Sequence, residues 1–303
     1  MKMYVGVTDL DWYETVKNND CDEVNFWTPS PKNFKAVNEN DMFLFKLHSP
    51  NNYIVGGGFF VRFSVLPTYL AWNAFGIKNG TTSLKVLNER ILKYRSKNSI
   101  ITDNPQIGCI ILTEPFFFEK SDWIPVPENW SNNIVSGKTY VLDDEYGKRL
   151  FDQVSERLHK NTVVESKQLE NRYGTYNTKH RLGQGAFRIA VTEAYNKRCA
   201  ITGEKTLPVL EAAHIKPYSD NGPHLTENGL LLRSDLHTLF DDGYITIAPD
   251  YHIEVSKRLH EDYGNGKDYY KYHGSKLLVL PQNENDLPSS EFLEWHNNEI
   301  YRG

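Results

Sequence analysis

The first 130 residues alternate short apolar segments with clusters of glycine, proline and asparagine. Between the last two of these segments, apolar residues recur at helical spacing at Leu84, Leu87 and Ile91. Three consecutive glycines, Gly56 to Gly58, predict a bulge or a close approach of two backbones. Four segments are rich in the β-branched and aromatic residues that favour strands, namely MYVGVTD, DMFLFKL, NYIVGGGFFVRFSVL and IGCIILTEPFFF. The pattern predicts a β-barrel or a strongly curved sheet that carries helices.

The second half of the chain has a different pattern. Residues 145–161 have helical periodicity, and a polar segment with few apolar residues follows them. We therefore expect a first domain at 1–155, a linker at 156–180 and a second domain at 181–303. Four features are expected in the second domain: a helix at AFRIAVTEAYNKR, a turn with two short strands over CAITGEKTLPVLEAAHI, a strand at KLLVL and a final helix at SSEFLEWHNNEIY.

Composition is that of a globular protein. The 303 residues are enough for two domains that each bury a core, and no run of about 18 apolar residues offers a membrane span. Acidic residues stand near the N-terminus where a signal peptide would be apolar, so we expect a cytoplasmic protein with no membrane partner. Cys21, Cys109 and Cys199 are widely separated, which argues against a disulfide framework and a cysteine-held zinc ion.

The stretch EAAHIKPYSDNGPHLTENGLLLRSDLHTLF, residues 211–240, contains side chains suited to catalysis. His214 would end one strand, Asn228 would precede a second strand, GLLLR, and His237 would lie on a short helix. In such a ββα unit the two histidines can face each other across a small cleft. Hydrolysis of a phosphodiester needs a base that deprotonates water and a cation that neutralises the phosphate and the leaving 3′ oxygen. A histidine suits the first task because its pKa is near neutral.

The order His, Asn, His and the phrases RCAITG, EAAHIKPYS and ENGLLLRSDLHTLFDDGYI resemble the HNH endonuclease domain of McrA-like restriction enzymes. The resemblance covers about residues 180–260. It implies that His214 is the general base, that Asn228 braces the loop between the strands by hydrogen bonds, and that His237 is a metal ligand. The implied cofactor is a divalent metal, magnesium or else manganese, cobalt or nickel, and no small-molecule cofactor is expected.

One position departs from the family pattern. Many HNH domains place an Asp or His immediately before the base as a second metal ligand, and here that residue is Ala213. The second ligand would then be Asp241, one turn beyond His237, or Glu211, two residues before Ala213, or water, which magnesium tolerates. His224, in NGPHLTENG, is interpreted as a loop residue.

The basic residues are unevenly distributed. The net charge of −5 offers nucleic acid no general attraction, yet residues 171–198 carry six basic side chains and a single acidic one. Such a strip binds phosphates or forms a solvated helix face, and Arg181 and Arg188 are its candidates for DNA contacts. Lys216 and Arg233 flank the predicted cleft and are candidates for holding the scissile phosphate.

The N-terminal segments VNFWTPS, FKAVNENDMFLFKLHSP and NNYIVGGGFFVRFS resemble the PUA-like superfamily, which includes EVE, ASCH and SRA domains. The resemblance implies a domain that flips a modified base out of a duplex and holds it between aromatic rings. A flipped base has to be stacked and read along its hydrogen-bonding edge. The candidates are Trp12 and Trp27, each expected just after a strand, with Asp9, Asn25 and Lys46, although tryptophans of a small β domain also pack its core.

These features predict an α+β protein with an N-terminal PUA-like β-barrel, flanking helices and a C-terminal ββα-metal nuclease domain. The leading hypothesis is a modification-dependent restriction endonuclease that recognises a modified base, most simply a cytosine, in double-stranded DNA. Cutting both strands would need a homodimer. Two alternatives remain open: an HNH nuclease directed to a backbone modification, RNA or unmodified DNA, and a degenerate, non-catalytic nucleic-acid binding protein.

Overall fold

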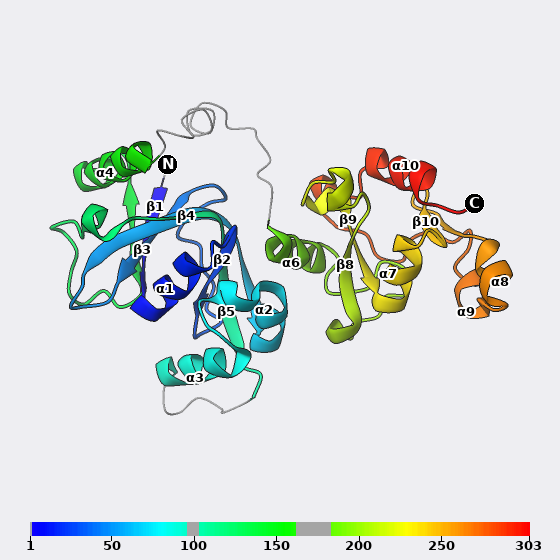
Figure 1. Ribbon diagram of the computed structural model, residues 1–303, viewed down its shortest axis with the longest axis horizontal. Coiled ribbons are helices and arrows are strands. Elements are labelled where there is room, and N and C mark those ends of the chain that lie inside the picture. Colours follow the sequence, from blue (N-terminus) through cyan, green and yellow to red (C-terminus); the bar gives the residue numbers. More distant parts are fainter. Residues whose placement is uncertain (1, 96–102, 162–182) are drawn as a thin grey trace. The chain divides into compact units, whose positions relative to one another are not determined.

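The computed structural model describes residues 2–95, 103–161 and 183–303. The chain divides into two compact units, Met1–His180 and Arg181–Gly303, which are described one at a time (Figure 1). Each unit contains both helices and strands, so the predicted α+β class is confirmed. No helix in the described ranges is both long enough and apolar enough to cross a membrane.

A seven-stranded mixed sheet organises the first unit. Its order is β2-β5-β4-β3-β1-β7, with β6 paired to β4 beside this path. Strands β1 and β3 run parallel, and the other pairs are antiparallel. The strands are β1 (Lys2–Thr8), β2 (Glu23–Thr28), β3 (Met42–Leu47), β4 (Tyr53–Pro67), β5 (Gln106–Phe117), β6 (Ile124–Pro125) and β7 (Gly137–Val141).

The predicted closed barrel is wrong. Strands β2 and β7 stand at opposite ends of the strand order and do not pair with each other in the described part of the chain, so the sheet stays open. The alternation of apolar residues predicts strands and curvature, but it does not determine which strands become neighbours. The glycine run does act as expected: the register of β4 shifts after Gly57, and a Cβ on Gly56 would lie 2.2 Å from the carbonyl oxygen of Phe116.

Both faces of this sheet are covered. Along β3, Phe43 and Phe45 belong to one buried cluster with residues of helix α1 (Leu10–Asn18), whereas Met42 and Leu44 belong to another with residues of helix α4 (Glu145–Asn161). Alternate residues of a strand point to opposite faces, so all six residues of β3 are buried. Helices α2 (Thr68–Phe75) and α3 (Leu84–Tyr94) follow β4, with the short 3₁₀ turn Gly76–Asn79 between them.

Helix α4 extends beyond the expected end of the first domain. It runs to Asn161, past residue 155, and its residues Leu150 and Val154 are buried against the sheet. Most of the expected linker, residues 162–180, lies outside the described residues.

The second unit is built around a strand–strand–helix element. Strands β8 (Leu210–His214) and β9 (Gly229–Arg233) form an antiparallel pair, and helix α7 (Ser234–Asp241) follows β9 directly. Helix α6 (Gln184–Ala194) packs on both strands. The remaining elements are the antiparallel pair β10 (Ile245–Ile247) and β11 (Ile253–Val255), and helices α8 (Arg258–Tyr263), α9 (Lys267–Tyr270) and α10 (Ser290–Glu299).

Two predictions for this unit are wrong. Residues 199–215 contain one strand, β8, instead of two, and the segment KLLVL is not a strand. The segment alternates as a strand would, with Leu277 and Val279 buried and Leu278 exposed. However, the amides of Leu278 and Val279 both donate to the carbonyl oxygen of Ala200 and do not join a ladder of strand hydrogen bonds.

Candidate active site

The ββα unit carries His214, Asn228 and His237. His214 is the last residue of β8 and pairs with Gly229, the first residue of β9. Asn228 immediately precedes β9, and His237 lies on α7. The unit is anchored because residues 230–232 of β9 are fully buried in the apolar core.

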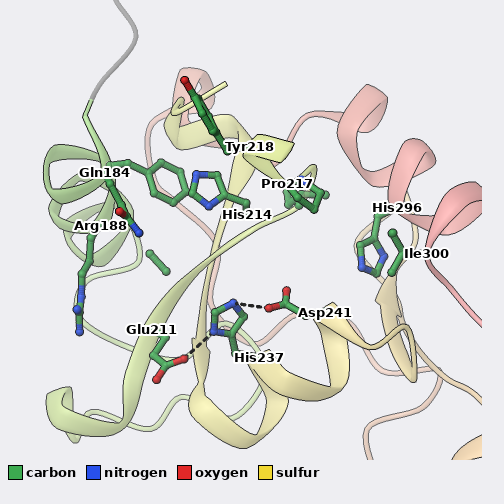
Figure 2. Close-up of a pocket in the computed structure, with 13 residues that line it drawn as sticks. Gln184, Arg188, Glu211, His214, Pro217, Tyr218, His237, Asp241, His296 and Ile300 are labelled. Atoms are coloured by element: carbon green, nitrogen blue, oxygen red, sulfur yellow. Dashed lines mark hydrogen bonds and ion pairs between the residues drawn. The ribbon is translucent and has the colours of Figure 1, made fainter. Parts of the chain in front are cut away.

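A cavity of about 430 Å³ lies over this unit (Figure 2). His214 and His237 both line it, from the strand and from the helix respectively. The other side chains of interest around it are Glu211, Asp241, Gln184, Phe187, Arg188, Tyr218 and His296. The structure therefore brings the predicted base and the predicted metal ligand to one cavity.

His237 is held between two carboxylates. Its Nδ1 atom lies 2.6 Å from Oε2 of Glu211, and its Nε2 atom lies 3.2 Å from Oδ2 of Asp241. Burial alone would lower the pKa of His237, but the hydrogen bonds and charges of the two carboxylates raise it above its ordinary value. The surroundings of this ring therefore favour positive charge.

The donor atoms around His237 suit a divalent cation. Imidazole nitrogen and carboxylate oxygen both ligate such ions. Because the carboxylates lie at opposite ring nitrogens, only one can share an ion with His237, and the other would orient the ring by accepting its remaining N–H. In Figure 2, Asp241 lies at the ring nitrogen on the side of His214, and Asp241 also raises the pKa of His214 electrostatically. Asp241 is thus better placed than Glu211 to be the second ligand.

Among the residues that the structure describes, no group of three or more His, Cys, Asp or Glu side chains is arranged to hold a metal ion. An ion at His237 would therefore have two protein ligands and would keep several waters, as magnesium usually does.

The imidazole of His214 is partly buried and is neutral at neutral pH. Burial lowers the pKa of His214 to about 4, the neighbouring His224 adds to this effect, and Asp241 opposes it. The ring stacks on Phe187, with ring centroids 3.9 Å apart and planes 13° from parallel. Its Nε2 atom lies 2.8 Å from Nδ1 of His224. At neutral pH, one of the two ring nitrogens of His214 therefore carries no proton.

Asn228 is fully buried and uses its amide to join two stretches of chain. Its Oδ1 atom accepts a hydrogen bond from the amide of Lys216, and its Nδ2 atom donates to the carbonyl oxygens of Lys216 and Pro223, each at 2.9 Å. These hydrogen bonds are of the kind expected for a residue that braces the loop between β8 and β9.

Two predicted phosphate-binding residues lie elsewhere. Lys216 places its Nζ atom 5.3 Å from the ring centroid of Trp295 on α10, and Arg233 makes two hydrogen bonds of 2.6 and 2.7 Å to Asp235. Neither residue lines the cavity, because each cation is drawn to a nearer partner. Arg188 does line the cavity, and Arg181 lies outside the described residues.

A second cavity, of about 570 Å³, lies within the first unit. Three of its polar lining residues are Asp9, Lys32 and His48. Its aromatic lining consists of Tyr4, Trp12, Phe26, Trp27, Phe34 and Tyr94. An apolar, aromatic cavity with a few polar groups is typical of a small-ligand site.

Three of the five predicted base-pocket residues line this second cavity. They are Asp9, Trp12 and Trp27. Trp12 lies on helix α1, is nearly fully buried and also packs in the core, and Trp27 lies within β2 and not just after a strand as expected.

Asn25 and Lys46 do not line the second cavity. Asn25 is fully buried and donates to Oδ1 of Asn79 at 2.8 Å, and Lys46 is 4% exposed and donates to Oδ1 of Asn52 at 2.8 Å. Strand alternation explains why Lys46 does not reach the second cavity. Phe45 packs with Trp12, which lines that cavity, and Lys46 points to the opposite face of β3.

Two contacts escape the sequence reasoning. Tyr94 lines the second cavity, and its hydroxyl group donates to both oxygens of Asp9 at 2.6 and 2.7 Å. His224 lies in a loop as expected, and its Nδ1 atom contacts Nε2 of His214. The sequence feature that could have indicated the contact of His224 with His214 is its position four residues before Asn228, in the loop between the two strands.

The family described as HNH endonuclease matches residues 199–248, which include His214, Asn228 and His237. No curated protein matches the sequence of the chain. A solved structure named "Modification dependent TagI restriction endonuclease" is similar with a TM-score of 0.30 and 12% sequence identity, and the similarity covers 92% of this chain and 75% of that chain. Residues 199–248 of this protein therefore form an HNH endonuclease domain.

Proposed function

We propose that this protein is a modification-dependent DNA endonuclease that hydrolyses phosphodiester bonds in the cavity between β8 and α7. The observation that carries the proposal is the pairing of a neutral His214 with a His237 held between two carboxylates, both facing one cavity of about 430 Å³. The ring of His214 can accept a proton, and the ring of His237, together with Asp241, can bind a cation.

In the proposed reaction, Nδ1 of His214 accepts a proton from a water molecule, and the oxygen of that water forms a bond to phosphorus. The bond between phosphorus and O3′ breaks, which leaves a 5′-phosphate and a 3′-hydroxyl group that takes its proton from solvent. A divalent cation bound by His237 and Asp241, magnesium or else manganese, cobalt or nickel, would supply the positive charge that the phosphate needs. Arg188 lines the same cavity and is placed to contact the DNA backbone.

The aromatic cavity of the first unit supports recognition of a base taken out of the duplex. Trp27 is held by a hydrogen bond of 3.0 Å from Nε1 to the carbonyl oxygen of Asn79, and it lies 6.4 Å from Tyr94 between ring centroids. Aromatic surfaces that are fixed in this way can stack on a base. The volume of about 570 Å³ is in the range of small-ligand sites.

The carboxylate of Asp9 in that cavity favours a base that carries an amino group, such as a modified cytosine. Asp9 can accept a hydrogen bond from an exocyclic amino group, whereas the carbonyl group of thymine would be repelled by its charge. Burial and the hydrogen bond to Asp9 raise the pKa of Tyr94 to about 12, so its hydroxyl group stays protonated and keeps donating to Asp9. His48 lies 3.6 Å from the same carboxylate.

One observation favours a non-catalytic alternative. Ala213 is fully buried, so the position that supplies a metal ligand in many HNH domains belongs here to the core. Asp241 provides a carboxylate from the helix in its place. In the catalytic proposal, double-strand cleavage needs two such domains, and we propose a homodimer for that purpose.

A plasmid-cutting assay separates these possibilities. Wild-type protein and the His214→Ala variant are incubated with modified plasmid and magnesium, with and without a chelator. We expect cutting by the wild type only, and only with metal present. Equal cutting by both proteins would show that His214 is not the base. Failure of the wild type on every DNA, with every metal, would favour the non-catalytic alternative.

A further inference from the structure

His224 contacts the proposed base from the side away from the cavity. Its Nδ1 atom is 2.8 Å from Nε2 of His214, and the ring centroids are 4.9 Å apart. His214 lines the cavity and His224 does not. Figure 2 shows a ring nitrogen of His214 directed towards His237 across the cavity. One nitrogen of the base therefore faces the reaction space, and the other is engaged by His224.

The loop that carries His224 is fixed by the same residue that fixes the strand of His214. The buried amide of Asn228 bonds to both backbone groups of Lys216, two residues after His214, and to the carbonyl oxygen of Pro223, next to His224. The loop also approaches the strand end closely, since a Cβ on Gly222 would lie 1.8 Å from the carbonyl oxygen of Lys216. The two histidines are thus held in register by backbone contacts.

Both imidazole rings are further restrained by stacking. His214 stacks on Phe187 at 3.9 Å, and His224 stacks on Tyr218 with ring centroids 4.8 Å apart and planes 6° from parallel. Rotation of either imidazole about the bond that joins it to Cβ would break its stacking contact. The stacking therefore favours the contact between the two ring nitrogens.

We propose that His224 is a positioning residue that holds His214 in the tautomer able to act as a base. This inference rests on the proposed function, in which His214 accepts the proton of water. A neutral imidazole has one N–H, and a contact between two ring nitrogens requires one of them to donate. If Nε2 of His214 donates to Nδ1 of His224, Nδ1 of His214 has a free lone pair towards the cavity. In the opposite arrangement, Nδ1 of His214 carries the proton and cannot accept another.

The same hydrogen bond becomes stronger during the reaction. When Nδ1 of His214 takes the proton of water, the ring becomes an imidazolium ion, and its Nε2–H bond to His224 becomes charge-assisted. An interaction that is stronger in the transition state than in the ground state accelerates the chemical step. The proton on Nε2 stays on His214, and the proton taken from water is later released to solvent.

Two substitutions of His224 separate an acceptor from a packing role. His224→Asn places an amide oxygen near the position of Nδ1 and retains the acceptor, whereas His224→Phe retains the stack on Tyr218 and removes the acceptor. We expect His224→Phe to lower kcat by about 10- to 100-fold with little change in KM for DNA, and His224→Asn to recover activity to within about fivefold of the wild type. His260→Phe, on the exposed surface of α8, is the matched control and should cut as the wild type does.

The outcomes are distinguishable from those that test the base itself. If His214→Ala is inactive but His224→Phe cuts at the wild-type rate, the positioning role is overturned and the proposed function stands. The same role is overturned if His224→Asn is as inactive as His224→Phe. If His214→Ala cuts normally, the proposed function fails.

A spectroscopic measurement needs neither a substrate nor a variant at His224. In protein labelled with ¹⁵N at histidine, the ring nitrogen signals of His214, assigned by their loss in His214→Ala, report which nitrogen carries the proton. We expect the proton on Nε2. A proton on Nδ1 in the wild-type protein at neutral pH would overturn the inference.

Discussion

Nε2 of His237 lies 3.2 Å from a carboxylate oxygen of Asp241, one turn further along helix α7. This relationship bears on Ala213, which stands where many HNH domains have a metal ligand. The strand position before the base is buried in the core, and a carboxylate four residues after His237 stands beside the imidazole instead. Residues four apart on a helix share a face, so the pair is built into a single element.

The two carboxylates around His237 should differ in their effect on metal binding. We expect Asp241→Asn to raise the magnesium concentration for half-maximal cutting by more than tenfold, because a neutral amide would replace the charged carboxylate that we propose as the second ligand. Glu211→Gln should have a smaller effect, because its amide oxygen can still accept the N–H of Nδ1. Titration of cutting rate against magnesium measures both. The reverse order of effects would assign the second ligand to Glu211.

Asn228 should contribute strongly to the stability of the second unit. Asn228→Ala leaves the backbone groups of Lys216 and Pro223 without their partner in a buried place, which should lower the free energy of unfolding by about 2–4 kcal/mol. Urea unfolding of the full chain, followed by a probe in the second unit, measures this change. Asn298→Ala, exposed on α10, is the control and should change it by no more than about 0.5 kcal/mol. Equal effects of the two substitutions would exclude the bracing role.

The stability of the second unit should fall in acid partly through His296. Its ring is 2% exposed, stacks on Phe240 at 3.8 Å, and contacts Thr246 and the carbonyl oxygen of Phe240. Burial lowers the pKa of His296 to about 4, from 6.5. Because the folded-state pKa is below the unfolded one, the unfolded chain takes up the proton first as the pH falls.

The stability linked to His296 is therefore complete above pH 6.5 and is lost progressively down to about pH 4, by up to about 3 kcal/mol. His296→Leu should be less stable than the wild type at pH 7 and should show a shallower decline between these values. Unfolding free energies measured at several pH values test this. Parallel curves for the two proteins would show that His296 does not titrate in this range.

The aromatic cavity of the first unit should control binding and not the chemical step. We expect Trp27→Ala to weaken binding of modified DNA by about 5- to 150-fold, the range expected from loss of one stacking contact of about 1–3 kcal/mol. Asp9→Asn should reduce the preference for an amino-bearing base. Fluorescence anisotropy with modified and unmodified duplexes measures both effects. Unchanged affinity in Trp27→Ala would remove Trp27 from the recognition site.

The sequence predicts the ββα element of the second unit because the contacts of that element are local. His214, Asn228 and His237 lie within 24 residues. The loop between β8 and β9 brings these two apolar strands together, and helix α7 follows β9 directly. By contrast, no local pattern shows that Lys216 contacts Trp295 on α10 or that Arg233 pairs with Asp235.

The first unit was harder to predict because its contacts are long-range. Residues of β2 pair with residues of β5 that lie 80 to 90 positions later, and no local pattern indicates that pairing or the open edge that results. The cavity there depends on Tyr94 reaching Asp9 across 85 positions of sequence. Aromatic residues such as Trp12 serve the core and the cavity at once, so composition alone cannot separate the two roles.

One substrate panel tests most directly whether the protein cuts DNA according to base modification. Wild-type protein is incubated with identical plasmids that carry plain, 5-methylated, 5-hydroxymethylated or glucosylated cytosine, each with magnesium, manganese, cobalt or nickel. We expect metal-dependent cutting of at least one modified plasmid and no cutting of the plain one. Equal cutting of all four plasmids would contradict it.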